Sequence, residues 1–304
     1  MATYRDFLDI SDRTRDEILG TLNEAARIKA DMKAGKGCDA LSGKTLAMVF
    51  QKPSARTRVS FEVGMYQLGG YALYLAPTDI GLGTRESVGD IARVLARYND
   101  GIMARVFSHG DVLELAEYSD VPVINGLSDL LHPCQVMADL LTIMEHKGGV
   151  EGLKVAFVGD GNNLCNSWLN AAFRLEFSLA LAIPEGYEPD REIFDRAVAA
   201  NPGLSVSRVP AEAVEGADVI YTDTWTSMGQ EEEAGQRRQD FGGFTVDTEL
   251  VRCASDDVIV MHCLPAHRGE EITDEVIDGP HSVVFDEAEN RLHAQKAILV
   301  ELLG

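Results

Sequence analysis

Short apolar runs alternate with helical patterns along almost the whole 304-residue chain. The runs are continuous rather than alternating, which is typical of strands buried on both faces. A strand followed by a helix, repeated many times, predicts parallel sheets covered by helices on both sides, so the expected fold class is α/β. The predicted strands are residues 45–50, 71–75, 101–107, 121–124, 153–159, 179–184, 218–223, 257–263 and 282–285.

The stretch HKGGVEG at 146–152 divides the chain into two similar halves. We therefore expect two α/β domains, one over residues 1–147 and one over 148–288, each a parallel sheet flanked by helices. No strand follows the last helical pattern, so we expect residues 289–304 to form a helix that returns to the first domain. An amphipathic helix is expected at about 12–33, and the polar stretch 229–244 is expected to be a long, mobile loop.

The charge of the chain excludes some partners. The formal net charge is −22, and such a chain repels nucleic acid and anionic membranes. No apolar run approaches the roughly 20 residues of a membrane span, and the N-terminus lacks the pattern of a secretion signal, so a cytoplasmic location is expected. The acidic surface and scarce lysine fit a halophile, and they fit an ordinary acidic protein equally well. The five scattered cysteines predict neither disulfides nor a metal site.

The stretch QKPSARTR, residues 51–58, gathers cations and hydroxyls directly after a predicted strand. A helix beginning there offers free backbone N–H groups and the positive end of its dipole, which suit a phosphate. Ser54 and Thr57 add hydroxyls, and the Arg56 guanidinium can hold two oxygens at once. The alternative is that Ser54 only caps the helix and the arginines form surface ion pairs.

Two further segments end predicted strands or begin helices. In LLHPCQ, His132 and Gln135 lie at the start of a helix, where they could hydrogen-bond a carbonyl oxygen, or His132 could merely satisfy a buried backbone group. Arg105 ends a predicted strand, and ligands of open α/β sheets bind at that edge. A solvated arginine is the alternative.

The second half has three such segments. GDGNN resembles a dinucleotide fingerprint but has Leu164 in place of its third glycine, so cofactor binding is weakly supported. Asp223 and Ser227 follow another strand and could hold an ammonium group. Cys263 ends a further strand, either as a buried structural thiol or as a Cys/His nucleophile.

Together the segments SARTR, HPCQ, GDGNN, TSMGQ and HCLP resemble the motifs of the aspartate/ornithine carbamoyltransferase family, and of its ornithine-using members in particular. The resemblance covers the whole chain in the family's order and spacing. It implies transfer of the carbamoyl group of carbamoyl phosphate to the δ-amine of L-ornithine, giving L-citrulline and phosphate. It also implies a first domain for carbamoyl phosphate, a second for ornithine, a homotrimer or multiple of trimers, and neither metal nor cofactor.

The resemblance assigns roles to individual residues. Catalytic roles fall to Arg56, Arg105, His132, Asp223 and Cys263. Carbamoyl phosphate is bound by Ser54, Ala55, Arg56, Thr57, Arg105, His132, Gln135, Cys263, Leu264 and Arg291. Ornithine is bound by Asn163, Asp223, Ser227 and Met228.

The sequence departs from the family pattern at two positions. Ala55 replaces a threonine, which matters little if its backbone N–H is the contact. Gly81 replaces a glutamine that reaches the substrate of a neighbouring subunit, which puts that contact in doubt. Two other classes stay open: an NAD-dependent dehydrogenase and a non-catalytic small-molecule-binding protein of the same fold.

Overall fold

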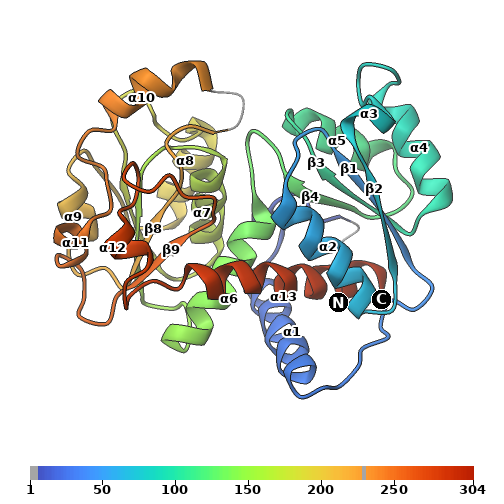
Figure 1. The fold of residues 1–304 in the computed structure, drawn as a ribbon, viewed down its shortest axis with the longest axis horizontal. Coiled ribbons are helices and arrows are strands. Elements are labelled where there is room, and N and C mark those ends of the chain that lie inside the picture. Colours follow the sequence, from blue (N-terminus) through green and yellow to red (C-terminus); the bar gives the residue numbers. More distant parts are fainter. Residues whose placement is uncertain (1–5, 228–230) are drawn as a thin grey trace. The chain divides into compact units, whose positions relative to one another are not determined.

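The computed structural model describes residues 6–227 and 231–304. The chain forms two compact units, the first made of residues 1–141 and 289–304 and the second of residues 142–288. Figure 1 shows both as a ribbon, with most of their helices and strands labelled. The α/β class predicted from the sequence is confirmed, since each unit contains a parallel sheet with helices around it.

The first unit contains a four-stranded parallel sheet in the order β2-β1-β3-β4. Its strands are β1 (Thr45–Phe50), β2 (Tyr71–Leu75), β3 (Gly101–Arg105) and β4 (Val123–Leu127). The central strands β1 and β3 are buried almost throughout, which is why they read as continuous apolar runs. The strand order reverses between β1 and β3, and Phe50 pairs with Arg105 at the ends of these strands. Such a reversal opens a crevice at the carboxyl edge of a parallel sheet.

The helices of the first unit surround this sheet. They are η1 (Ile10–Asp12), α1 (Arg15–Lys33), α2 (Ala55–Gln67), α3 (Pro77–Ile80), α4 (Val88–Tyr98), α5 (His109–Tyr118), the first part of α6 (Pro133–Lys147) and most of α13 (Val284–Leu303). A capping box between Thr14 and Glu17 begins α1. The expected return of the C-terminal helix to the first unit is confirmed, because residues 289–304 belong to it.

The second unit contains a five-stranded parallel sheet in the order β7-β6-β5-β8-β9. Its strands are β5 (Lys154–Val158), β6 (Ser178–Ala182), β7 (Leu204–Ser207), β8 (Val219–Thr222) and β9 (Ile259–His262). Here the order reverses between β5 and β8, and the last residues of β5, β8 and β9 pair in register. The segments that follow these three strands therefore emerge at one edge of the sheet.

The helices of the second unit are mostly short. They are α7 (Asn163–Arg174), α8 (Arg191–Ala200), α9 (Pro210–Val214), η2 (Glu231–Glu233), α10 (Ala234–Asp240), α11 (Thr248–Val251) and α12 (Asp274–Ile277), together with the last residues of α6 and the first of α13. Within the described ranges, none of the chain's helices has both the length and the apolar character that crossing a bilayer requires.

Three details of the predicted element pattern are wrong. The run 282–285 is not a strand, because only Ser282 bridges to Val260 before α13 begins at Val284. Strand β7 was missed, since its LSVS sequence is half exposed at the edge of the sheet and carries little apolar signal. The expected loop 229–244 contains helix α10, which Arg237 anchors to the sheet edge through buried Asp160.

Candidate active site

The turn between β1 and α2 has the geometry of an anion site. The Ser54 hydroxyl caps α2 by accepting a hydrogen bond from the Thr57 amide at 3.3 Å. The amides of Ala55 and Arg56 come first in the helix and have no acceptor within the described residues. Free N–H groups at a helix N-terminus attract phosphate, so the capping role of Ser54 and the phosphate role are compatible.

The two arginines of this turn have different roles. Arg58 pairs with Glu62 at 3.1 Å, and its guanidinium lies 3.9 Å from the centre of the Tyr74 ring, so it is a structural surface residue. Arg56 is exposed and forms no ion pair with any residue in the described part of the chain. The surface-pair alternative therefore fits Arg58, whereas Arg56 is available to bind a phosphate.

A buried cluster lies beside the turn. Arg291 of α13 donates to the Gln135 side-chain oxygen at 2.6 Å and to the Thr57 hydroxyl at 3.2 Å. Gln135 in turn donates to Asp139 at 2.8 Å. Arg291 is 4% exposed and Gln135 is 1% exposed. These contacts fix the start of α6 against the start of α2, so the two helix N-termini predicted from the sequence do lie together.

His132 is the residue on which these charges act. Burial lowers the pKa of His132 well below its ordinary value, and the nearby Arg291, Arg105 and Arg56 lower it further. The imidazole is therefore neutral at physiological pH, when it can donate one hydrogen bond without adding charge. Arg105 ends β3 and is buried at 8% exposure. The structure thus brings together the three arginines and the histidine predicted for the first domain.

In the second unit, Asp223 is the centre of the candidate site. It follows β8 and is 9% exposed. Its carboxylate accepts hydrogen bonds from the Asn162 side-chain amide at 2.8 Å, from the Thr224 amide at 2.8 Å and from the Cys263 thiol at 3.0 Å. These donors come from the segments after β5, β8 and β9, as the strand register requires.

Asn162 was not among the predicted site residues. Its side-chain oxygen accepts from the amides of Leu164 and Cys165 at 2.9 and 3.1 Å, which caps α7, while its nitrogen holds Asp223. The double asparagine of GDGNN was the available signal. Asn163 is the first residue of α7, and Ser227 lies four residues after Asp223. Met228 lies outside the described residues.

The surroundings of Gly161 argue against a dinucleotide-binding site. A side chain there would meet the backbone of Tyr187 and Pro189 at 2.4 Å. The glycine is therefore required by the close approach of the chain's own loop. Asp160 beside it forms a buried pair with Arg237 at 2.9 Å, and Arg237 also donates to the Trp225 carbonyl at 2.8 Å. Burial raises the pKa of Asp160 to about 6 despite this partner.

The backbone after β9 is held by a buried polar chain. The Leu264 amide donates to His262 Nδ1 at 2.8 Å, so the imidazole carries its proton on Nε2 and donates to Glu271 at 3.0 Å. Leu264 has a φ of +53°, a strained value for a residue with a branched side chain. Because its N–H is engaged, Leu264 can offer a ligand only its carbonyl.

Among the residues that the structure describes, two groups of side chains have the spacing of metal ligands. Asp223, His262 and Cys263 lie with ligand atoms within 4.8 Å of one another, as do His267, Glu270 and Glu271. In the first group both imidazole nitrogens of His262 are already hydrogen-bonded, one to the Leu264 amide and one to Glu271. That group therefore offers an ion only Asp223 and Cys263 without breaking the support of the backbone.

The known proteins similar to this chain agree with the motifs. The sequence profile of the aspartate/ornithine carbamoyltransferase carbamoyl-P binding domain matches residues 5–145, and that of the Asp/Orn binding domain matches residues 151–302. The chain belongs to the aspartate/ornithine carbamoyltransferase family. The resemblance stated from the motifs is thereby confirmed.

Individual relatives of this family match over nearly their full length. The chain is 57% identical to the ornithine carbamoyltransferase of Thermococcus kodakarensis, over 99% of this chain and 96% of that protein. It is 56% identical to the enzyme of that name from Carboxydothermus hydrogenoformans, over 100% of both. The solved structure of ornithine carbamoyltransferase from Pyrococcus furiosus superposes with a TM-score of 0.95 at 54% identity, covering 99% of this chain and 97% of that one.

Proposed function

We propose that the chain transfers the carbamoyl group of carbamoyl phosphate to the δ-amine of L-ornithine, giving L-citrulline and phosphate. The observation that carries this proposal is the set of three arginines around the neutral, buried His132 at the carboxyl edge of the first sheet. An anion with a carbonyl group fits this set, because the guanidiniums neutralise the phosphate while the imidazole donates to the carbonyl.

The phosphate would be held at the start of α2. The free amides of Ala55 and Arg56, the hydroxyls of Ser54 and Thr57 and the guanidinium of Arg105 supply its donors. Arg56 would contact both the phosphate and the carbamoyl oxygen.

The carbamoyl carbonyl would be polarised by His132 and by the Arg291–Gln135 pair. As the amine attacks, the carbonyl oxygen gains negative charge, and donors already fixed in a buried site stabilise it without reorganisation. Gln135 acts mainly by positioning, since both ends of its amide are bonded, to Asp139 and to Arg291. The backbone of Cys263 and Leu264 keeps its predicted role with the carbamoyl group, limited for Leu264 to the carbonyl.

Ornithine would be held by the second unit. Asp223 and Ser227 would take the α-ammonium, and Asn163 and the Met228 amide the α-carboxylate. The δ-amine has to lose a proton before attack, since a free alkylamine has a pKa of about 10. Asp223 and the Cys263 thiol, already linked at 3.0 Å, would accept and relay that proton.

The assembly and location are part of the same proposal. We assign residues 1–147 to carbamoyl phosphate, 148–288 to ornithine and 289–304 to the returning helix, in a cytoplasmic homotrimer without a cofactor. Gly81 lies in the left-handed region with a φ of +55°, and a side chain there would meet Arg85 at 2.8 Å. The loop is thus built around glycine, and position 81 itself offers no side chain to a neighbouring subunit.

A citrulline assay tests the proposal. The purified chain with carbamoyl phosphate and L-ornithine should release citrulline and phosphate in equal amounts, and the Arg56→Ala variant, purified identically, should be the matched inactive control. Binding of both substrates without citrulline would instead indicate a non-catalytic binding protein. Saturable NAD binding would favour the dehydrogenase class.

A further inference from the structure

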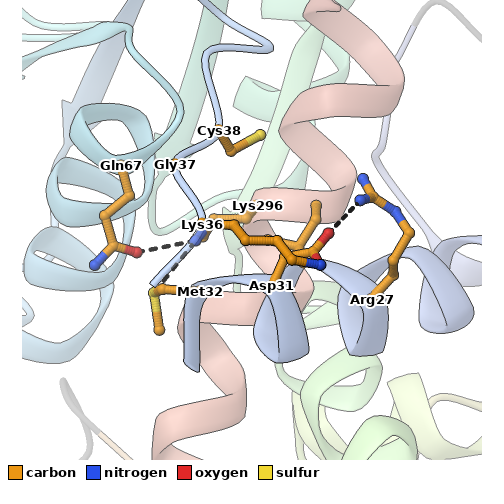
Figure 2. Close-up of a pocket in the computed structure, with 9 residues that line it drawn as sticks. Arg27, Asp31, Met32, Lys36, Gly37, Cys38, Gln67 and Lys296 are labelled. Atoms are coloured by element: carbon orange, nitrogen blue, oxygen red, sulfur yellow. Dashed lines mark hydrogen bonds and ion pairs between the residues drawn. The ribbon is translucent and has the colours of Figure 1, made fainter. Parts of the chain in front are cut away.

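The first unit contains a cavity that lies away from the phosphate turn. It has a volume of about 200 Å³ and is lined by α1, the loop after α1, the last residue of α2 and Lys296 of α13. Helix α2 begins at the Ser54 turn and ends at this cavity, so its 13 residues separate the two places by about 20 Å. Figure 2 shows the side chains that line the cavity.

Lys296 is the buried charge of this cavity. It is 1% exposed, and its ammonium donates to the Gln67 side-chain oxygen at 2.9 Å and approaches the Met32 sulfur at 3.7 Å. Both partners are neutral, and no carboxylate within residues 6–227 and 231–304 lies in ion-pair distance of it. Burial lowers the pKa of Lys296. A buried ammonium without a counter-charge is costly, so its surroundings favour an anion.

The other charges at the cavity leave Lys296 uncompensated. Asp31 is the carboxylate of the lining, and its two oxygens bind Arg27 at 2.7 Å and Lys36 at 2.8 Å. Arg27 is held further by Glu24 at 2.6 Å. These pairs neutralise one another at the rim, as the dashed contacts of Figure 2 illustrate for Arg27 and Asp31. The inner end of the cavity therefore keeps one positive charge.

We propose that this cavity is a binding site for a small organic carboxylate, with the Lys296 ammonium and the Gln67 amide at its charged end. A volume of about 200 Å³ has room for about six or seven groups of water size, at roughly 30 Å³ each. Ile28 and Met32 provide apolar walls for a short aliphatic body. One uncompensated charge matches a monoanion better than phosphate, whose second charge would remain unpaired.

Butyrate is the probe for the test, at constant ionic strength and with inorganic phosphate as the comparison. Butyrate at ten times its dissociation constant should raise the melting temperature by about 2–4 °C, with saturation. The Arg56→Ala variant should keep this response, which separates the cavity from the phosphate turn. Lys296→Met should lose it. The matched control is Lys29→Met, which removes a buried lysine bonded to Asn290 at 2.7 Å and outside the lining.

Cavity filling provides a second variant. Cys38→Trp places an indole in the cavity from the loop after α1 and should abolish butyrate binding while Lys296 remains, measured as line broadening of ¹³C-butyrate by NMR. The proposal is overturned if the butyrate response, in melting temperature or line broadening, survives Lys296→Met or Cys38→Trp. It is also overturned if Lys29→Met loses the response equally, or if the response of the wild-type protein does not saturate with butyrate. Equal saturation by phosphate in Arg56→Ala would refute the preference for a monoanion.

Discussion

Substitution of Asp223 by asparagine is the sharpest test of how ornithine is recognised. Both carboxylate oxygens face donors: one accepts from Asn162, and the other accepts from the Thr224 amide and the Cys263 thiol. An asparagine must turn its NH₂ group toward one of these donors. Asn162 cannot flip to compensate, because its oxygen caps α7 through two amides. The variant therefore loses one hydrogen bond as well as the charge.

The size of the effect follows from the charge lost to the substrate. A hydrogen bond to a charged group contributes about 1.5–3 kcal/mol, which corresponds to about 10- to 150-fold in kcat/KM for ornithine. Asp223 is 9% exposed, so solvent weakens the interaction little. The donor that loses its acceptor in this variant lowers the free energy of unfolding by about 1–3 kcal/mol. Stability is therefore measured in parallel by urea unfolding.

The assay compares two amines with saturating carbamoyl phosphate. L-ornithine carries the α-ammonium proposed to bind Asp223, whereas 5-aminopentanoate lacks it and keeps the carboxylate and the reacting amine. Asp223→Asn should lower kcat/KM for ornithine at least tenfold more than for 5-aminopentanoate, and leave the carbamoyl phosphate dissociation constant within about threefold. Equal losses for the two amines would restrict Asp223 to the reacting amine and refute its contact with the α-ammonium. An unchanged kcat/KM for ornithine would refute both of its proposed roles.

Three other substitutions give measurable outcomes. Arg56→Ala should lower kcat/KM at least 100-fold, because losing one charged donor to the developing oxyanion costs about 3 kcal/mol; near-normal kinetics would contradict the site. Arg291→Met removes a cation beside His132 and should raise the pKa of that imidazole, measured by NMR; an unchanged value would contradict their coupling. Asp160 is protonated more readily in the folded state, with a pKa of about 6 against 3.8, so its charge destabilises the fold progressively as pH rises from about 4 to 6. The difference in unfolding free energy between Asp160→Asn and wild type should therefore shift in favour of the variant by about 2.5 kcal/mol between pH 4 and pH 7.5 in urea titrations, and a pH-independent difference would refute this.

The fold was predictable where burial gave a strong pattern. Strand β1 has the predicted bounds, because its continuous apolar run is buried almost throughout. Strand β2 also has the predicted bounds, although none of its residues is buried, because its run YALYL is apolar along its whole length. Strand β7 escaped because an edge strand needs few apolar residues. The run 282–285 was mistaken for a strand because its apolar residues lead from the bridge at Ser282 into helix α13, and a short apolar run does not distinguish a strand from the start of a helix.

The site was predictable only as a set of residue types. Strand ends and helix starts located Ser54, Arg105 and Asp223, but which partners hold them depends on register. The different roles of Arg56 and Arg58 became clear only from the positions of Glu62 and Tyr74, which hold Arg58. Glu62 lies on the same helix and Tyr74 on a neighbouring strand. Likewise the double role of Asn162 follows from α7 starting beside the end of β8, which no local pattern reveals.

The two units differ in the sign of the charge at the carboxyl edges of their sheets. The first gathers Arg56, Arg105 and Arg291 around a histidine that stays neutral, which keeps the edge cationic without adding a titrating group. The second presents Asp223, while its neighbour Asp160 is already neutralised by Arg237. A dianionic substrate is therefore attracted to the first edge and a diamine to the second. In an acidic chain with a net charge of −22, an ion pair with one of the chain's own carboxylates would compete with an anionic substrate for these arginines. Within the described residues Arg56 forms no such pair, so its charge stays available to the substrate.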